Sequence, residues 1–185
     1  MNKKVVYIRF FAQINPKTAN TLMQHVEQKL REGVEHFVIL ISSPGGNVFS
    51  GISVYNFLKG IPAEVATHNF GSVDSVAILL FCAGSKRFCV PHARFLLHGI
   101  GFDVPAGARF DEKLLDERIK SLQMDRENIS RVIADNSGKK KEDVEQDMFT
   151  GIVLNPALAR DYGLVHEIKS TLLEKGAEII SITDD

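Results

Sequence analysis

The chain has 185 residues and a formal net charge of -1 at pH 7, from 22 basic and 23 acidic side chains. This length suits one domain with a substantial core, and the balanced charge gives no indication of a nucleic-acid partner. No apolar run approaches the ~20 residues that span a bilayer, and the two cysteines, Cys82 and Cys89, show no disulfide or metal-site spacing. We therefore expect a soluble, cytoplasmic protein that uses no membrane, metal or cofactor.

The first sixty residues alternate between strand and helix patterns. VVYIRFF (5–11) is β-branched and aromatic, and residues 15–33 carry apolar side chains four positions apart, which predicts a strand followed by an amphipathic helix. FVILIS (37–42) is a continuous apolar run, typical of a strand buried on both faces, and a helical pattern follows at 48–60. Such alternation favours an α/β domain with a largely parallel sheet.

The rest of the chain continues this alternation. We expect a strand at 63–70, a helix at 74–84 that Gly84 stops, and two short strands within 86–100 around Pro91. The C-terminal part then predicts a long charged helix at 110–135, a helix at 142–149, a short strand at 151–154, a capped helix at 155–163 and a strand at 164–168. The tail after residue 170 is weakly patterned and fits either a mobile end or one more edge strand.

Two glycine-containing turns, at 42–48 and 69–75, each follow a predicted strand. Ligands bind at the carboxyl ends of strands in α/β folds, so we expect both turns to face one site. The second turn places Ser72, Asp74 and Ser75 at the mouth of an apolar helix. These polar residues either cap the helix or hold a nucleophile where the helix dipole favours an oxyanion.

Three segments together carry a family resemblance: SPGGNVFSGISVYNFLKGI (43–61), GSVDSVAILLFCAGSKRFCVPHARFLLHG (71–99) and LNPALARDYGLVHEI (154–168). In this order they resemble the proteolytic subunit of the Clp protease, a serine peptidase of the crotonase-like fold group. The resemblance runs from about residue 5 to about 168. It implies an α/β fold of repeated ββα and βα units in a single domain over 1–185, with a handle region at about 101–149 and a tail at about 170–185.

The resemblance also assigns roles to individual residues. Ser75 stands at the position of the nucleophile and His98 at that of the general base, while the backbone N–H groups of Gly46 and Val76 stand where the family binds the oxyanion. A hydroxyl nucleophile needs an adjacent base, and each preorganised oxyanion donor contributes ~3 kcal/mol to transition-state stabilisation. The implied function is hydrolysis of peptides or unfolded proteins.

Two positions depart from the family pattern. Gly151 occupies the position of the aspartate that orients the histidine, and the nearest carboxylate is Asp147, four residues earlier. Asp147 could replace the missing aspartate, the site could work as a Ser–His dyad, or the enzyme could be impaired. Asp74 stands where the family has a small residue, and we interpret it as a helix cap.

The resemblance implies an oligomeric ring and a Clp-type ATPase partner. Against the ATPase stands the lack of a counterpart, before the first strand, to the family segment that lines the axial pore. Two other functions stay open beside the peptidase. One is a catalytically impaired structural or regulatory ring subunit, which Gly151 suggests. The other is a crotonase-type acyl-CoA enzyme, against which the pair of Ser75 and His98 argues.

Overall fold

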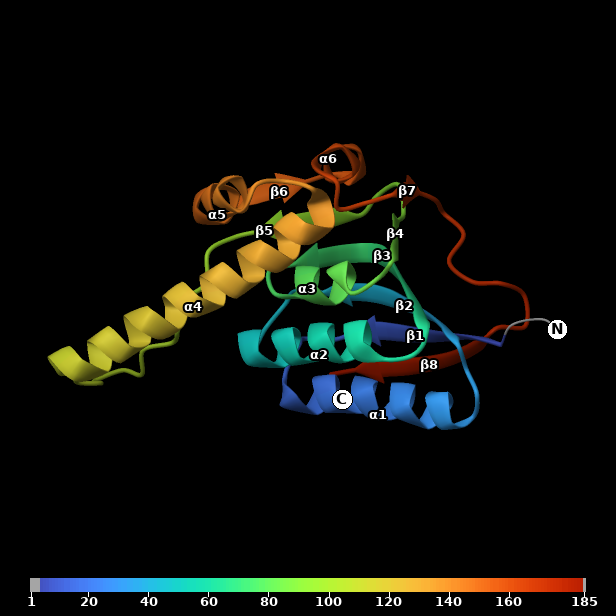
Figure 1. Ribbon diagram of the computed structural model, residues 1–185, viewed down its shortest axis with the longest axis horizontal. Helices are drawn as coiled ribbons and strands as arrows, with labels where there is room; N and C mark the ends of the chain where they lie inside the picture. The colour runs from blue at the N-terminus through green and yellow to red at the C-terminus, as the bar shows by residue number, and fades with distance from the viewer. Residues whose placement is uncertain (1–3, 185) are drawn as a thin grey trace.

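The computed structural model describes residues 4–184, which contain one eight-stranded sheet (Figure 1). Its main path runs β6-β5-β3-β2-β1-β8, and β4 and β7 branch from β3. The strands are β1 (Val5–Phe11), β2 (His36–Ser43), β3 (Glu64–Asp74), β4 (Lys86–Cys89), β5 (Arg94–Leu97), β6 (Ile152–Leu154), β7 (Glu167–Ile168) and β8 (Glu178–Thr183). The β5–β6 pair is antiparallel and all other pairs are parallel, as the continuous apolar runs predict.

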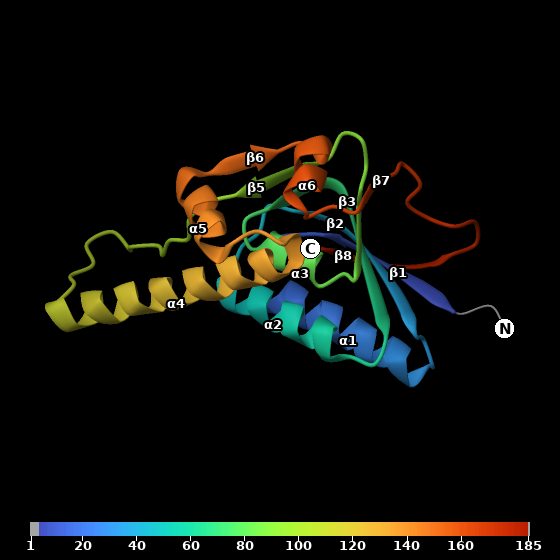
Figure 2. The ribbon, with the colours of Figure 1, turned by 45° about the horizontal axis from the view of Figure 1, so that its top comes forward.

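Six helices accompany this sheet within the described residues. They are α1 (Pro16–Arg31), α2 (Val48–Gly60), α3 (Ala77–Cys82), α4 (Glu112–Ser137), α5 (Lys141–Thr150) and α6 (Pro156–Tyr162). Helices α1, α2 and α3 lie side by side on one face of the sheet in both ribbon views (Figures 1 and 2). The α/β fold predicted from the sequence is therefore confirmed.

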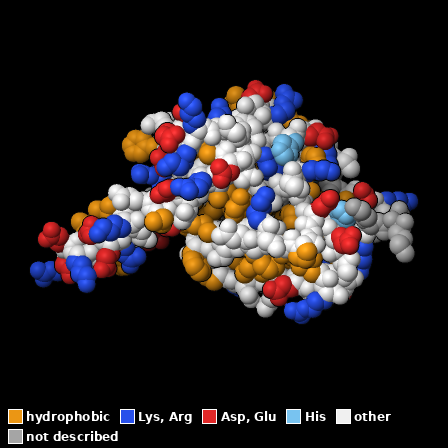
Figure 3. Space-filling view, viewed as in Figure 1, with side chains coloured by type: hydrophobic (Ala, Val, Ile, Leu, Met, Phe, Trp, Pro, Cys, Tyr) orange, Lys and Arg blue, Asp and Glu red, His pale blue; other side chains and the backbone are white. Residues whose placement is uncertain are grey.

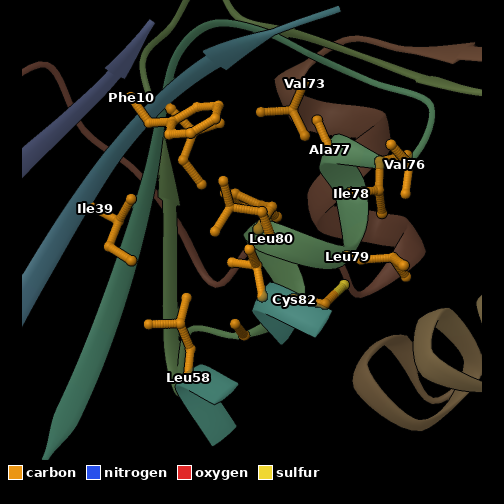
Figure 4. Packing of buried hydrophobic residues seen from close by; sticks show 14 of the residues in the cluster. Phe10, Ile39, Leu58, Val73, Val76, Ala77, Ile78, Leu79, Leu80 and Cys82 are labelled. Carbon is orange, nitrogen blue, oxygen red and sulfur yellow. The ribbon is translucent and has the colours of Figure 1, made fainter. Parts of the chain in front are cut away.

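The core lies between the sheet and these three helices (Figure 4). Helix α3 is apolar on all sides, and all of its residues are buried. Such a helix is stable only when it is surrounded by other elements, and here Leu80 faces the sheet while Leu58 of α2 closes the layer (Figure 4). This packing fixes the start of α3, and with it the turn that contains Ser75.

Strand β3 changes partner along its length. Residues 66–69 pair with β4, whereas 72–74 pair with β5 in the register Ser72 to Arg94, Val73 to Phe95 and Asp74 to Leu96. The prediction of a strand at 63–70 and a helix from residue 74 was wrong at this point. Tertiary pairing with β5 extends the strand to Asp74, and α3 begins three residues later.

The C-terminal tail forms the edge of the sheet. Strand β8 pairs with β1, and Lys29 Nζ of α1 lies 2.6 Å from Glu178 Oε1. The Asp184 carboxylate then accepts a hydrogen bond from the Gln13 N–H at 2.8 Å. Of the two expectations for the tail, the edge strand is the one found, while the strand predicted at 164–168 is reduced to the two residues of β7.

Helix α4 projects beyond the body of the molecule, and its outer end is covered largely by charged side chains (Figures 1 and 3). It is 26 residues long, and its Asp111 cap accepts a hydrogen bond from the Leu114 N–H at 2.8 Å. This helix lies within the predicted handle region. Among residues 4–184, none of the helices is long and apolar enough to cross a membrane.

Candidate active site

Ser75 occupies a strained turn between β3 and α3. Its φ is +58°, and no other non-glycine residue within residues 4–184 has a positive φ. A left-handed conformation costs an L-residue about 1–2 kcal/mol, and such strain is found mainly at functional sites. The turn is held by a 2.8 Å hydrogen bond from the Ser75 N–H to the Leu96 carbonyl of β5. Serine nucleophiles on strand-to-helix turns share this geometry.

The SPGG turn packs directly against the serine turn. A Cβ atom added to Gly45 would lie 2.7 Å from Ser75 Cβ and 2.7 Å from the Asp74 carbonyl oxygen. One added to Gly46 would collide with the Ile14 carbonyl oxygen. Both glycines also have a positive φ, so no side chain fits at either position. The two turns therefore lie together, as the sequence predicts.

Two backbone donors at these turns are free. Within residues 4–184, neither the Gly46 N–H nor the Val76 N–H has a hydrogen-bond acceptor, whereas the N–H of Asn47 donates to the Ile14 carbonyl at 2.7 Å. A site that binds an oxyanion needs donors that the fold itself leaves unpaired. These are the two amides to which the family resemblance assigned that role.

His98 follows β5 directly, as Ser75 follows β3. Because the two strands are parallel neighbours, their carboxyl ends meet, and Ser75 and His98 line the same cavity of about 10 Å³. The other lining residues are apolar and come largely from α3, β5, α4 and α5: Val76, Ile78, Leu97, Ile100, Ile129, Ile133 and Met148. Such a volume holds about one water molecule. The two side chains share no hydrogen bond in this arrangement.

Two larger grooves flank this cavity. The first has a volume of about 650 Å³, lies between α4 and α5, and shares Ile100 and Met148 with the cavity. The second, of about 550 Å³, runs from Gly46 to α4, where Arg118 and Asp125 line it. Each groove is large enough to hold part of an extended chain.

Gly151 lies opposite His98 on the far side of β5. The antiparallel register pairs Leu97 with Ile152, so the next step along the ladder brings His98 opposite Gly151. A Cβ atom at Gly151 would meet nothing within 4 Å, and its φ is +77°. The position where the family carries its aspartate is therefore next to the histidine, open, and without a side chain.

Asp147 has a different partner. Its Oδ2 accepts a 2.7 Å hydrogen bond from the hydroxyl of Tyr162 in α6, and burial together with this carboxylate raises the pKa of Tyr162. No hydrogen bond joins Asp147 to His98. The proposal that Asp147 completes a triad stays a prediction, and the structure shows what the carboxylate does in this arrangement.

The interpretation of Asp74 as a helix cap was wrong. Asp74 ends β3, and α3 has Val76 at its N-cap position without a capping side chain. The Asp74 carboxylate instead pairs with Arg94 of β5, whose Nη2 lies 2.6 Å from Asp74 Oδ2. Arg94 was missed in the sequence, because only the β3–β5 register shows that it lies near the nucleophile position.

Three other groups that could carry chemistry are inert by burial. Desolvation lowers the pKa of His68 to about 4, and the ring donates a hydrogen bond from Nε2 to the Lys169 carbonyl at 3.2 Å. Burial also raises the pKa of the Cys82 thiol to about 12 and that of Cys89 to about 11. His68 is therefore a neutral core residue and both cysteines are protonated at neutral pH.

Comparisons with known proteins identify the family of the chain. The family model for Clp protease matches residues 3–171. An ATP-dependent Clp protease proteolytic subunit from Paracoccus denitrificans is 31% identical over 161 residues, which cover 84% of this chain and 77% of that protein. Proteolytic subunit 3 from Parasynechococcus marenigrum is 28% identical over 164 residues, with 86% and 80% covered. A solved structure of a ClpP1 mutant from Listeria monocytogenes superposes with a TM-score of 0.77 at 28% identity and covers 92% of this chain and 93% of that one. The chain belongs to the Clp protease family.

Proposed function

We propose that the protein is a serine endopeptidase that hydrolyses peptides or unfolded proteins through an acyl-enzyme intermediate. One observation carries this proposal: Ser75, in its strained turn, and His98 line a single cavity at the carboxyl ends of two adjacent parallel strands. The flanking grooves match an extended peptide as substrate. Membership of the Clp protease family supports the reaction class.

In the proposed reaction, the His98 imidazole accepts the proton of the Ser75 hydroxyl as Oγ attacks the scissile carbonyl carbon. The oxyanion that forms accepts hydrogen bonds from the Gly46 and Val76 N–H groups, which the fold leaves unpaired. The imidazolium then donates its proton to the leaving amine. A water molecule, deprotonated by the same imidazole, hydrolyses the acyl-enzyme and restores Ser75.

The orientation of His98 is the weakest part of this machinery. Gly151 supplies no carboxylate, and the Asp147 carboxylate is bound to Tyr162. We therefore propose that Ser75 and His98 work as a catalytic pair. The alternative is a triad in which Asp147 is the third member. Loss of the orienting aspartate costs serine proteases about 10⁴-fold in kcat, so we expect slow turnover.

We also propose that the chain works as an oligomer. Large apolar side chains are exposed on α4, α5, β6 and α6: Leu114, Leu115, Ile119, Met124, Phe149, Val153 and Leu158. Apolar surface on this scale marks interaction sites, and a closed ring would hide part of it. The relatives are described as ATP-dependent, so a Clp-type ATPase is the proposed partner. Light scattering after size-exclusion chromatography measures the oligomeric state.

A fluorophosphonate probe tests the proposed nucleophile directly. We expect the probe to label the protein on Ser75, as identified by mass spectrometry of the modified peptide. Ser75→Ala should abolish labelling, and His98→Ala should lower both the labelling rate and peptide hydrolysis by at least about 10⁴-fold. Ser53→Ala is the matched control, because this hydroxyl is exposed on α2 and bonds only the Phe49 carbonyl. Absence of labelling in every oligomeric state between pH 6 and 9 would contradict the proposal.

A further inference from the structure

The two strands that carry the reacting side chains are joined by an ion pair. The Arg94 guanidinium places Nη2 2.6 Å from Asp74 Oδ2 and Nε 3.4 Å from Asp74 Oδ1. Its Nε also donates to Ser72 Oγ at 3.1 Å. One arginine on β5 therefore contacts two residues of β3, both on the strand face opposite Val73, which points toward α3 in the core (Figure 4).

The pair spans the ladder on a diagonal. Arg94 lies opposite Ser72, whereas Asp74 lies opposite Leu96, two residues further along β5. A bond of this kind resists sliding of one strand against the other, because a shift in either direction moves the guanidinium and the carboxylate out of their paired geometry. The Asp74 side chain retains only 12% of its exposure, while that of Arg94 retains 52%. A nearly buried carboxylate depends on its cation, since removal of the cation leaves a buried, unpaired charge.

The ladder at this point is short. Only three residue pairs join β3 to β5, and the 2.8 Å bond from the Ser75 N–H to the Leu96 carbonyl continues it by one step. Ser75 follows the last residue of β3 and His98 the last residue of β5. The register of β3 and β5 therefore contributes to the relative height of the nucleophile and the base, together with the packing of α3 and of the SPGG turn.

We propose that the Asp74–Arg94 ion pair is a positioning device that holds Ser75 at the height of His98. This inference rests on the proposed function for its effect on catalysis. Neither side chain touches the reacting atoms; both act through the strands that end at Ser75 and His98. The pair also places a cation beside a carboxylate next to the nucleophile, which limits the repulsion of a developing oxyanion.

The chemistry of the pair offers graded variants. Asp74→Asn and Arg94→Gln each remove one charge with little change in volume, and the double variant removes both. Arg94→Lys keeps the charge but loses the fork that reaches Ser72 and Asp74 together. A matched control is Glu27→Gln, which removes the carboxylate of the exposed Arg31–Glu27 pair on α1, where Nη2 and Oε2 lie 3.6 Å apart.

Two measurements on the full-length, assembled protein test the proposal. Peptide hydrolysis gives kcat and KM separately, and hydrogen exchange followed by mass spectrometry reports the protection of the Ser75 amide. We expect each single variant to lose about 10–100-fold in kcat with KM changed less than twofold, because small misplacements of reacting groups act on kcat. The protection of the Ser75 amide should fall about tenfold in Asp74→Asn and in Arg94→Gln. Arg94→Lys should lie between these variants and the wild type in both measurements. Glu27→Gln should match the wild type.

The double variant supplies a further criterion. It should lose less activity than the two single losses combined, because each single substitution already breaks the ion pair. Wild-type exchange at Ser75 in the single variants, lost protection with unchanged kcat, or additive losses in the double variant would each overturn the proposal. Should the wild type never react with a fluorophosphonate, the proposed function fails by itself, and exchange at Ser75 still decides whether the pair holds the strand end.

Discussion

Strands β3 and β6, the two neighbours of β5, contribute very different groups to the surroundings of His98, the proposed base. The β3 side provides a parallel ladder, a strained serine, free backbone amides and an ion pair. On the β6 side, the antiparallel ladder leads to Gly151, which has no side chain, and the carboxylate of Asp147, four residues earlier in the chain, is bound to Tyr162. The features on the β3 side come mostly from backbone geometry that the fold enforces. The contribution from the β6 side depends on one carboxylate side chain, so a single substitution can remove that carboxylate without disturbing the fold.

Restoring the missing carboxylate should have the largest effect on this comparison. We expect Gly151→Asp to raise kcat about 10–1000-fold, because an aspartate opposite His98 can orient the imidazole and stabilise the imidazolium. The site is open, and Asp tolerates a φ of +77° better than most residues. Peptide hydrolysis measures the effect. Gly151→Asn is the matched control, since it has the same shape and backbone tolerance without the charge, and equal gains in both variants would refute the electrostatic explanation.

The β3 half should also respond to acid through His68. Burial lowers the folded-state pKa of His68 to about 4, whereas the unfolded chain has its ordinary value near 6.5. Below pH 6.5 the unfolded state therefore binds a proton that the folded state does not. The free energy of unfolding should fall by up to about 3 kcal/mol as the pH drops from 6.5 to 4.

Urea unfolding at a series of pH values measures this loss of stability. His68→Asn should remove most of the dependence over this range, although it will lower stability at neutral pH. His92→Asn is the control, because that side chain is exposed and should leave the dependence intact. An unchanged profile in the His68 variant would show that other groups cause the acid sensitivity.

The smallest effects are expected from the pair of Asp147 and Tyr162. Tyr162→Phe and Asp147→Asn each disrupt the 2.7 Å hydrogen bond between these side chains, which should lower the free energy of unfolding by about 1 kcal/mol. Because the Asp147 carboxylate is bound to Tyr162 and not to His98, we expect kcat to change less than about threefold in either variant. A loss above about 100-fold in Asp147→Asn alone would instead establish Asp147 as the third member of a triad.

The sequence predicted those features that local patterns encode. The order of strands and helices follows from residues close together in the chain, and the meeting of the two glycine-containing turns follows from the parallel sheet that this order predicts. The end of β3 and the pairing of Asp74 were mispredicted, because they depend on Arg94, twenty residues away in another strand. A polar SVD segment before an apolar helix has the pattern of a cap, and only the partner strand reveals that it is not one.

The roles of Ser75 and His98 stay predictions that the geometry supports. The number of residues between them does not give the distance between their side chains. They share a cavity because β3 and β5 are parallel neighbours in the sheet. The partner of Asp147 could not have been found from the sequence either. Its hydrogen bond to Tyr162 joins two short helices whose relative placement depends on the whole α5–β6–α6 segment.

The last described residue of the chain reaches the neighbourhood of the oxyanion turn. The Asp184 carboxylate accepts a hydrogen bond from the Gln13 N–H. Ile14, which follows Gln13, donates its N–H to the Gly45 carbonyl and accepts a hydrogen bond from the Asn47 N–H. Gln13 also lines the same groove as Gly46. Removal of β8 together with Asp184 would therefore disturb more than a remote sheet edge, because the segment that supports the SPGG turn would lose its hydrogen bond to Asp184.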